Sequence, residues 1–104
     1  MAKPADIGRV GEAHVVRWLQ QRGYWTNWDT KAPGATDIEA RGIENLLVQV
    51  KAAVQPDVPA ALSPAEVSAI KERAARIGFS VYSAGVTLDR TLRLVGEVQW
   101  VKLA

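Results

Sequence analysis

The sequence has 104 residues, of which 48% are hydrophobic and 23% charged, with no cysteine and a net charge of +2 at pH 7. This length fits one domain, residues 1–104, with a single core, and the lack of thiols excludes disulfides and cysteine metal sites. The lack of cysteine also fits a reducing cytoplasm, which is where we expect the protein to act. No apolar run approaches the roughly 20 residues that cross a bilayer, and no charged-then-apolar leader opens the chain, so we expect no membrane partner. The mildly basic balance permits nucleic-acid binding without requiring it.

The first helix is expected from Asp6 to about Arg22, where apolar residues recur at helical spacing. Asp6 is a candidate N-cap, and Gly23 stands at the C-terminal end of the helix. Glu12 lies on or beside the stripe that faces inward, where ionised glutamate is rare unless it has a partner. Without such a partner, Glu12 would be a boundary residue that reaches solvent.

Residues Tyr24–Asp29 are rich in aromatic and β-branched side chains and predict the first strand. Trp25 and Trp28 within it are able to stack on nucleic-acid bases. Packing against a core is the commoner role of tryptophan, and it is the interpretation we favour for both.

After a loop at Thr30–Ala35, residues Thr36–Lys51 predict a hairpin of two strands that turns at Arg41–Asn45. Side chains alternate between the two faces of a strand, so part of the second strand points into a core. The residues expected in this core are Leu46, Val48 and Val50.

The same alternation groups the polar residues of this hairpin. Asp37 and Glu39 share one face of the first strand, and Gln49 and Lys51 share one face of the second. If the two polar faces coincide, an acid, an amide oxygen and an ammonium converge on one patch. A hydrophobic hairpin gains no stability from such residues, and we therefore expect the patch to bind a metal ion or an anion.

Residues Ala52–Leu62 contain two prolines and predict a loop, which is either ordered by a substrate or a plain connector. Ser63, Pro64 and Glu66 have the spacing of a capping box with proline at the first helical position. They begin a second helix that ends at Gly78.

Two strands are expected after the second helix, at Phe79–Leu88 and at Thr91–Leu103, the latter interrupted at Gly96. The order of elements is then helix, three strands, helix and two strands. This order predicts an α/β sandwich with a mixed sheet.

The patch has the side chains that a hard divalent cation prefers. Mg²⁺ binds oxygen ligands, usually one or two carboxylates with waters and substrate phosphate. Asp37 offers a carboxylate, Gln49 an amide oxygen and Val50 a backbone carbonyl, while Glu12 would add a second negative charge. Lys51 would orient or help to deprotonate a water, or offset the negative charge on a pentavalent phosphorane. This set of groups fits phosphodiester hydrolysis.

The pattern Gly8-x3-Glu12, Thr36-Asp37 and Gln49-Val50-Lys51 resembles the PD-(D/E)xK nuclease superfamily, which has the restriction-endonuclease-like fold. The resemblance covers nearly the whole chain. The small size, the glutamate of the first helix and the Gly-Tyr pair after it are similar to archaeal Holliday junction resolvases. The Gln-x-Lys motif is similar to the Mrr-type restriction branch.

The resemblance implies an α-β-β-β-α-β(-β) sandwich around a central mixed sheet. It also implies a Mg²⁺- or Mn²⁺-dependent DNA endonuclease, working as a homodimer on branched or duplex DNA. Glu12, Asp37 and Gln49 would then hold the metal, and Lys51 would be catalytic. No organic cofactor is expected, because no glycine-rich phosphate loop is present.

Two positions depart from the pattern of the family. Thr36 replaces a common proline without consequence for the chemistry, whereas Gln49 stands where an acid is usual and removes a negative charge. Glu12 or Glu39 would have to compensate for that loss. Two alternatives follow, namely a DNA-binding or assembly module with weak or lost catalysis, and a purely structural ion-pair cluster. The latter explains the residues poorly, because such pairs contribute little net stability.

Overall fold

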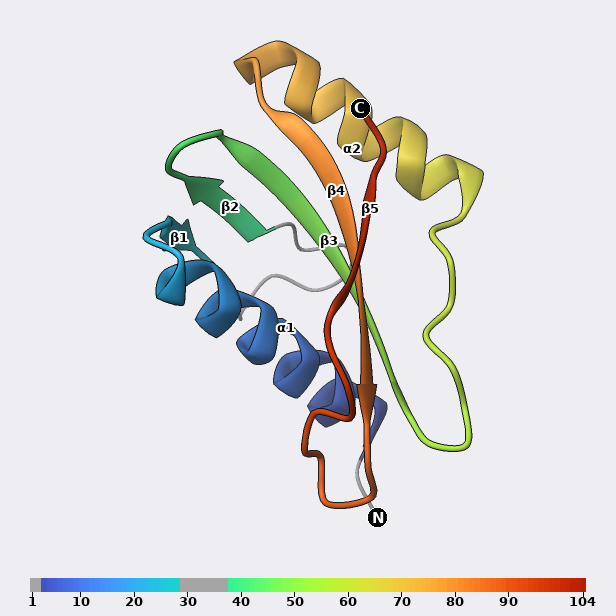
Figure 1. Ribbon diagram of the computed structural model, residues 1–104. Coiled ribbons are helices and arrows are strands. Elements are labelled where there is room, and N and C mark those ends of the chain that lie inside the picture. The colour runs from blue at the N-terminus through green and yellow to red at the C-terminus, as the bar shows by residue number, and fades with distance from the viewer. Residues whose placement is uncertain (1–2, 29–37) are drawn as a thin grey trace.

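The computed structural model describes residues 3–28 and 38–104, and its elements follow the predicted order (Figure 1). The class is α/β with a mixed sheet, as expected. The elements are α1 (Pro4–Gln21), β1 (Trp25–Asn27), β2 (Ile38–Arg41), β3 (Leu46–Val54), α2 (Pro64–Ile77), β4 (Ser80–Leu88) and β5 (Gln99–Lys102). Neither helix is both long enough and apolar enough to cross a membrane.

The sheet has five strands in the order β1-β2-β3-β4-β5. β3 and β4 are parallel, and their register runs from Leu46 opposite Ser80 to Val54 opposite Leu88. The other neighbours are antiparallel. A parallel pair requires a long crossover, and the loop after β3 together with α2 provides it.

The two helices cover opposite faces of the sheet, which we call the α1 face and the α2 face (Figure 1). Alternation along β3 divides its residues between them. On the α1 face, buried side chains of helix and sheet pack together: Val15, Val16, Leu19, Ile38, Leu46, Val48 and Val86. On the α2 face, a smaller cluster contains Leu47, Ile70, Ala74 and Val81.

The helix ends follow local rules with one exception. α2 has the predicted capping box between Ser63 and Glu66, and Gly78 ends it with φ +73°. α1 begins earlier than expected, with Lys3 as an N-cap whose side chain makes no capping hydrogen bond. The assignment of Asp6 as the N-cap was therefore wrong, because a proline at the first helical position, Pro4, already starts the helix.

β3 is longer than predicted. It continues through Val54, whereas the sequence predicted a loop from Ala52 onward. The reason is non-local, since Ala52 and Val54 pair with Val86 and Leu88 of β4. The first predicted strand, Tyr24–Asp29, is confirmed only for the three residues of β1. Asp29 lies outside the described residues.

The last strand is shorter than predicted, since only residues 99–102 of Thr91–Leu103 form β5. The Asp89 carboxylate organises the chain before it, accepting hydrogen bonds from the backbone N–H and hydroxyl of Thr91 and from the backbone N–H of Arg93. These bonds form a turn after β4. The chain then runs back beside the end of β4, where Leu94 makes an isolated bridge with Leu88.

α1 approaches the sheet most closely at Gly11. A Cβ atom at this position would lie 2.5 Å from the Cβ of Ala52 on β3. A Cβ at Gly8, one turn earlier, would have no atom within 4 Å. Gly11 is therefore a packing requirement, whereas Gly8 is not.

We expect Gly11→Ala to lower the free energy of unfolding by about 1–3 kcal/mol, because the added methyl forces α1 away from β3. Gly8→Ala is the matched control, and it should raise that free energy by about 0.5–1 kcal/mol through helix propensity alone. Urea unfolding followed by circular dichroism measures both. Equal effects of the two substitutions would contradict the close approach.

Candidate functional site

The candidate site lies on the α2 face of β3. Gln49 and Lys51 project from this face, opposite Ser83 and Gly85 of β4. They share it with Leu47, which packs against α2. The two polar residues therefore share a face, as the alternation predicted.

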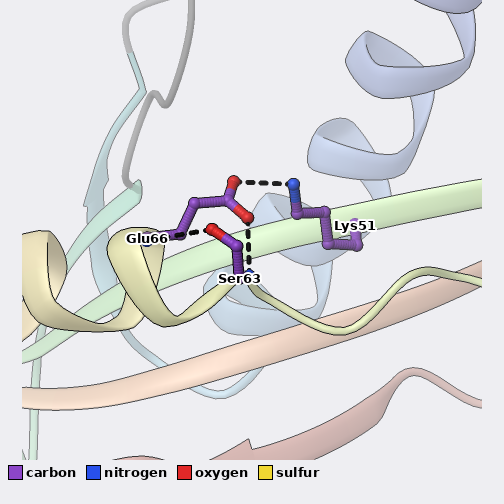
Figure 2. Close-up of polar contacts among 3 residues, drawn as sticks. All are labelled: Lys51, Ser63 and Glu66. Carbon is purple, nitrogen blue, oxygen red and sulfur yellow. Dashed lines mark hydrogen bonds and ion pairs between the residues drawn. The ribbon is translucent and has the colours of Figure 1, made fainter.

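Lys51 is anchored to the start of α2 (Figure 2). Its Nζ donates to Oε2 of Glu66 at 2.7 Å, and both side chains are about seven-tenths buried. The other carboxylate oxygen, Oε1, accepts a hydrogen bond from the backbone N–H of Ser63 at 2.9 Å. The backbone N–H of Glu66 in turn donates to Oγ of Ser63 at 3.1 Å. One carboxylate thus caps the helix and binds the lysine.

These contacts set the charge of Glu66. The hydrogen bond from Lys51, followed by that from the Ser63 backbone, holds the pKa of the Glu66 carboxyl below its ordinary value. Hydrogen bonds to the charged form of an acid favour that form. Glu66 is therefore an anion at neutral pH, and the site contains a carboxylate beside an ammonium.

Gln49 is the one buried polar residue among the residues that the structure describes. Its side chain is 6% exposed, and its Oε1 has no hydrogen-bond partner. A buried acceptor without a partner costs about 1–3 kcal/mol. The oxygen therefore has unused capacity to accept a hydrogen bond or to bind a cation.

Two further acids were proposed for this site, and each has a hydrogen-bond partner away from Lys51. Glu12 accepts a hydrogen bond from Nε1 of Trp28 at 2.7 Å, and its helix covers the α1 face rather than the face of Lys51. Trp28 is thus the partner that this carboxylate needed. Glu39 lies opposite Leu47 and so on the α2 face, where it pairs with Arg41 at 3.2 Å.

Two predicted ligands remain, Asp37 and Val50. Asp37 lies outside the described residues, just before Ile38, the first residue of β2. The Val50 side chain packs against the core of the α1 face, which leaves its backbone carbonyl as the candidate ligand. Within residues 3–28 and 38–104, no three His, Asp or Glu side chains are grouped as a metal site.

From its position in the sequence, Glu66 was expected to have only a capping role. The spacing of Ser63 and Glu66 identified the helix start, and that prediction is confirmed. The contact with Lys51 depends on how α2 is docked against β3. The two tryptophans of the first predicted strand differ in burial. Trp28 packs against the core as expected, whereas Trp25 is 56% exposed.

A groove of about 380 Å³ opens beside Lys51. Lys51 and the loop at 59–62 form part of its wall, and mostly apolar groups of β4, β5, Val67 on α2 and Leu103 line the rest. Ser83 and Gln99 add polar atoms to this lining. The groove gives Lys51 a route to solvent on the α2 face.

Comparison of the sequence with profiles of known protein families and with curated proteins gives no match.

The contacts of Glu66 predict an acid-dependent contribution to stability. Its pKa is lower in the folded protein than the ordinary 4.5, so the contribution is complete above that pH and is lost as the pH falls through the folded-state pKa. We expect Glu66→Gln to flatten the decline in stability below about pH 4.5, measured by urea unfolding at several pH values.

Glu72→Gln is the control for this measurement. Glu72 pairs with Arg76 on the exposed side of the same helix, and such pairs contribute little. Its curve should follow the wild type. If Glu66→Gln and wild type decline in parallel with acid, the carboxylate does not hold Lys51 in solution.

Proposed function

We propose that this protein is a metal-dependent DNA endonuclease that hydrolyses phosphodiester bonds on a restriction-endonuclease-like fold. The observation that carries the proposal is the partly buried Lys51 ammonium beside Gln49, whose buried oxygen lacks a partner. The strand that holds them pairs with β2, which begins directly after Asp37. The likeness of the motif residues to PD-(D/E)xK nucleases supports the same conclusion.

The donor set suits a hard cation. Asp37, Oε1 of Gln49 and the Val50 carbonyl would hold Mg²⁺ or Mn²⁺, all through oxygen, as these ions prefer. Glu12 would join these ligands only if its carboxylate gave up the hydrogen bond from Trp28 and bound the metal instead. When bound, such an ion polarises a phosphoryl oxygen and lowers the pKa of a bound water.

Lys51 acts in this proposal as a fixed positive charge. Its Nζ donates a hydrogen bond to the Glu66 carboxylate, and it would donate to a phosphate oxygen in the same way. Directed at a scissile phosphate, it would stabilise the negative charge that develops on the phosphoryl oxygens. The groove beside it gives the phosphate access.

The substrate of the proposal is DNA, with branched DNA of Holliday-junction shape as the form that the resolvase likeness favours, cut by a homodimer. Two strands of a junction need two active sites, which a pair of chains would supply. The formal charge of +2 is small, so most affinity would come from local cations that contact phosphates.

A second candidate is a catalytically weak or inactive DNA-binding or assembly module on the same fold. The neutral amide of Gln49 favours it, because one carboxylate fewer weakens the hold on a divalent cation. Such a module would bind DNA without cutting it in either Mg²⁺ or Mn²⁺.

We expect cleavage of at least one of four substrates, a four-way junction, a flap, single-stranded DNA or linear duplex, in Mg²⁺ or Mn²⁺ but not in EDTA. Lys51→Ala should lower the rate by roughly 10²–10³-fold, through lost charge stabilisation. Asp37→Asn should abolish cutting while DNA binding persists, because phosphate contacts provide most affinity.

Lys102→Ala removes an exposed lysine that pairs with Glu44, and it is the control that should leave the rate unchanged. Full activity of Asp37→Asn would remove that residue from the mechanism. DNA binding without any cutting by the wild type would favour the inactive module.

The homodimer has its own test. Size-exclusion chromatography with light scattering should return twice the mass of the 11.3 kDa chain for the free protein, and the same protein mass on junction DNA once the mass of the DNA is subtracted. A strict monomer on DNA would make junction resolution by paired sites untenable.

A further inference from the structure

We propose that Glu66 supplies the carboxylate that position 49 lacks, so that Glu66 and Gln49 together bind a divalent cation beside Lys51. This inference rests on the proposed function, and it assigns a metal ligand that sequence motifs alone do not identify.

The side-chain oxygen of Gln49 is unsatisfied. It is more than nine-tenths buried on the α2 face and has no donor among the described residues. An amide oxygen binds a hard cation but brings no charge, so the site needs an acid nearby.

Glu66 reaches the residues of β3 that form the site. It extends from the first turn of α2 across β3 and contacts Lys51, which shares the face of Gln49 two residues away (Figure 2). The helix start places the carboxylate there through the reciprocal bonds with Ser63. The acid is therefore preorganised, and its position does not depend on the loop before it.

The Glu66 carboxylate has unused acceptor capacity. An ionised carboxylate offers about four lone-pair sites. The structure uses one site on each oxygen of Glu66, for the Ser63 backbone and for Lys51. The remaining lone pairs are free to coordinate a cation while both existing bonds are kept.

The other acids near β3 are less suited to this role. Glu12 is bound to Trp28 on the α1 side, and Glu39 is held by Arg41 on β2. Among the residues that the structure describes, Glu66 is the acid paired with Lys51. Glu66 on α2 would therefore supply the negative charge that the neutral side chain of Gln49 does not bring.

The test measures Mn²⁺ binding to the full chain by isothermal titration calorimetry and by electron paramagnetic resonance, independently of cleavage. Glu66→Gln removes the charge yet keeps the helix start, because glutamine also completes a capping box. We expect it to weaken Mn²⁺ binding about 10–100-fold. Glu72→Gln, on the same helix, should bind as the wild type does.

A double variant that moves the carboxylate from position 66 to position 49 makes the test more specific. Adding Gln49→Glu to Glu66→Gln returns the carboxylate to β3 and should restore Mn²⁺ affinity to within a few-fold of the wild type, as an order-of-magnitude expectation. Glu66→Asp keeps the charge on a shorter side chain and should bind more tightly than Glu66→Gln. Thermal unfolding by circular dichroism establishes that each variant is folded.

The outcomes separate this inference from the proposed function. Equal Mn²⁺ affinity of the wild type, Glu66→Gln and Glu66→Asp would overturn the role of Glu66 and leave the nuclease proposal standing. Loss of Mn²⁺ binding in Glu66→Gln without DNA cleavage by the wild type would support the cation site and overturn the nuclease. No Mn²⁺ binding by the wild type would overturn both.

Discussion

The parallel pairing of β3 with β4 is the constraint on which the rest of the structure depends. It runs over the whole length of both strands and lies at the centre of the sheet. Because side chains alternate, this register decides which residues meet α1 and which meet α2. A slip of one residue would bury Lys51 against α1 and turn Val48 and Val50 toward α2. The candidate site thus exists only in this register.

The parallel arrangement also brings Lys51 and Glu66 together. A parallel strand can follow only after a crossover, so the chain must leave β3, pass over the α2 face and return to begin β4. α2 is that crossover, and its first turn lies near the middle of β3 (Figures 1 and 2). The ion pair is therefore a consequence of connectivity as much as of charge. Its position beside the groove keeps the lysine within reach of solvent.

The two faces of the sheet serve different ends. The α1 face holds the larger apolar cluster and a close approach at Gly11, so it carries most of the packing. The α2 face is covered by a smaller cluster and leaves room for polar groups. This asymmetry explains how the protein tolerates the unpaired oxygen of Gln49. The free-energy cost of that oxygen is offset by the apolar packing on the α1 face of the same strand. It also gives the proposed cation site a rigid support, because β3 is fixed on its other face.

The sequence by itself determined what depends on neighbours along the chain. The start of α2 at Ser63, the shared face of Gln49 and Lys51, and the order of helices and strands all follow from capping chemistry and alternation. Tertiary structure alone decided what depends on partners distant in sequence: the extension of β3 to Val54, the Trp28 partner of Glu12, and the Glu66 partner of Lys51. Capping and alternation are encoded within a few residues. Pairing between β3 and β4, and the docking of each helix on its own face, have no local signature, because many registers satisfy the same pattern.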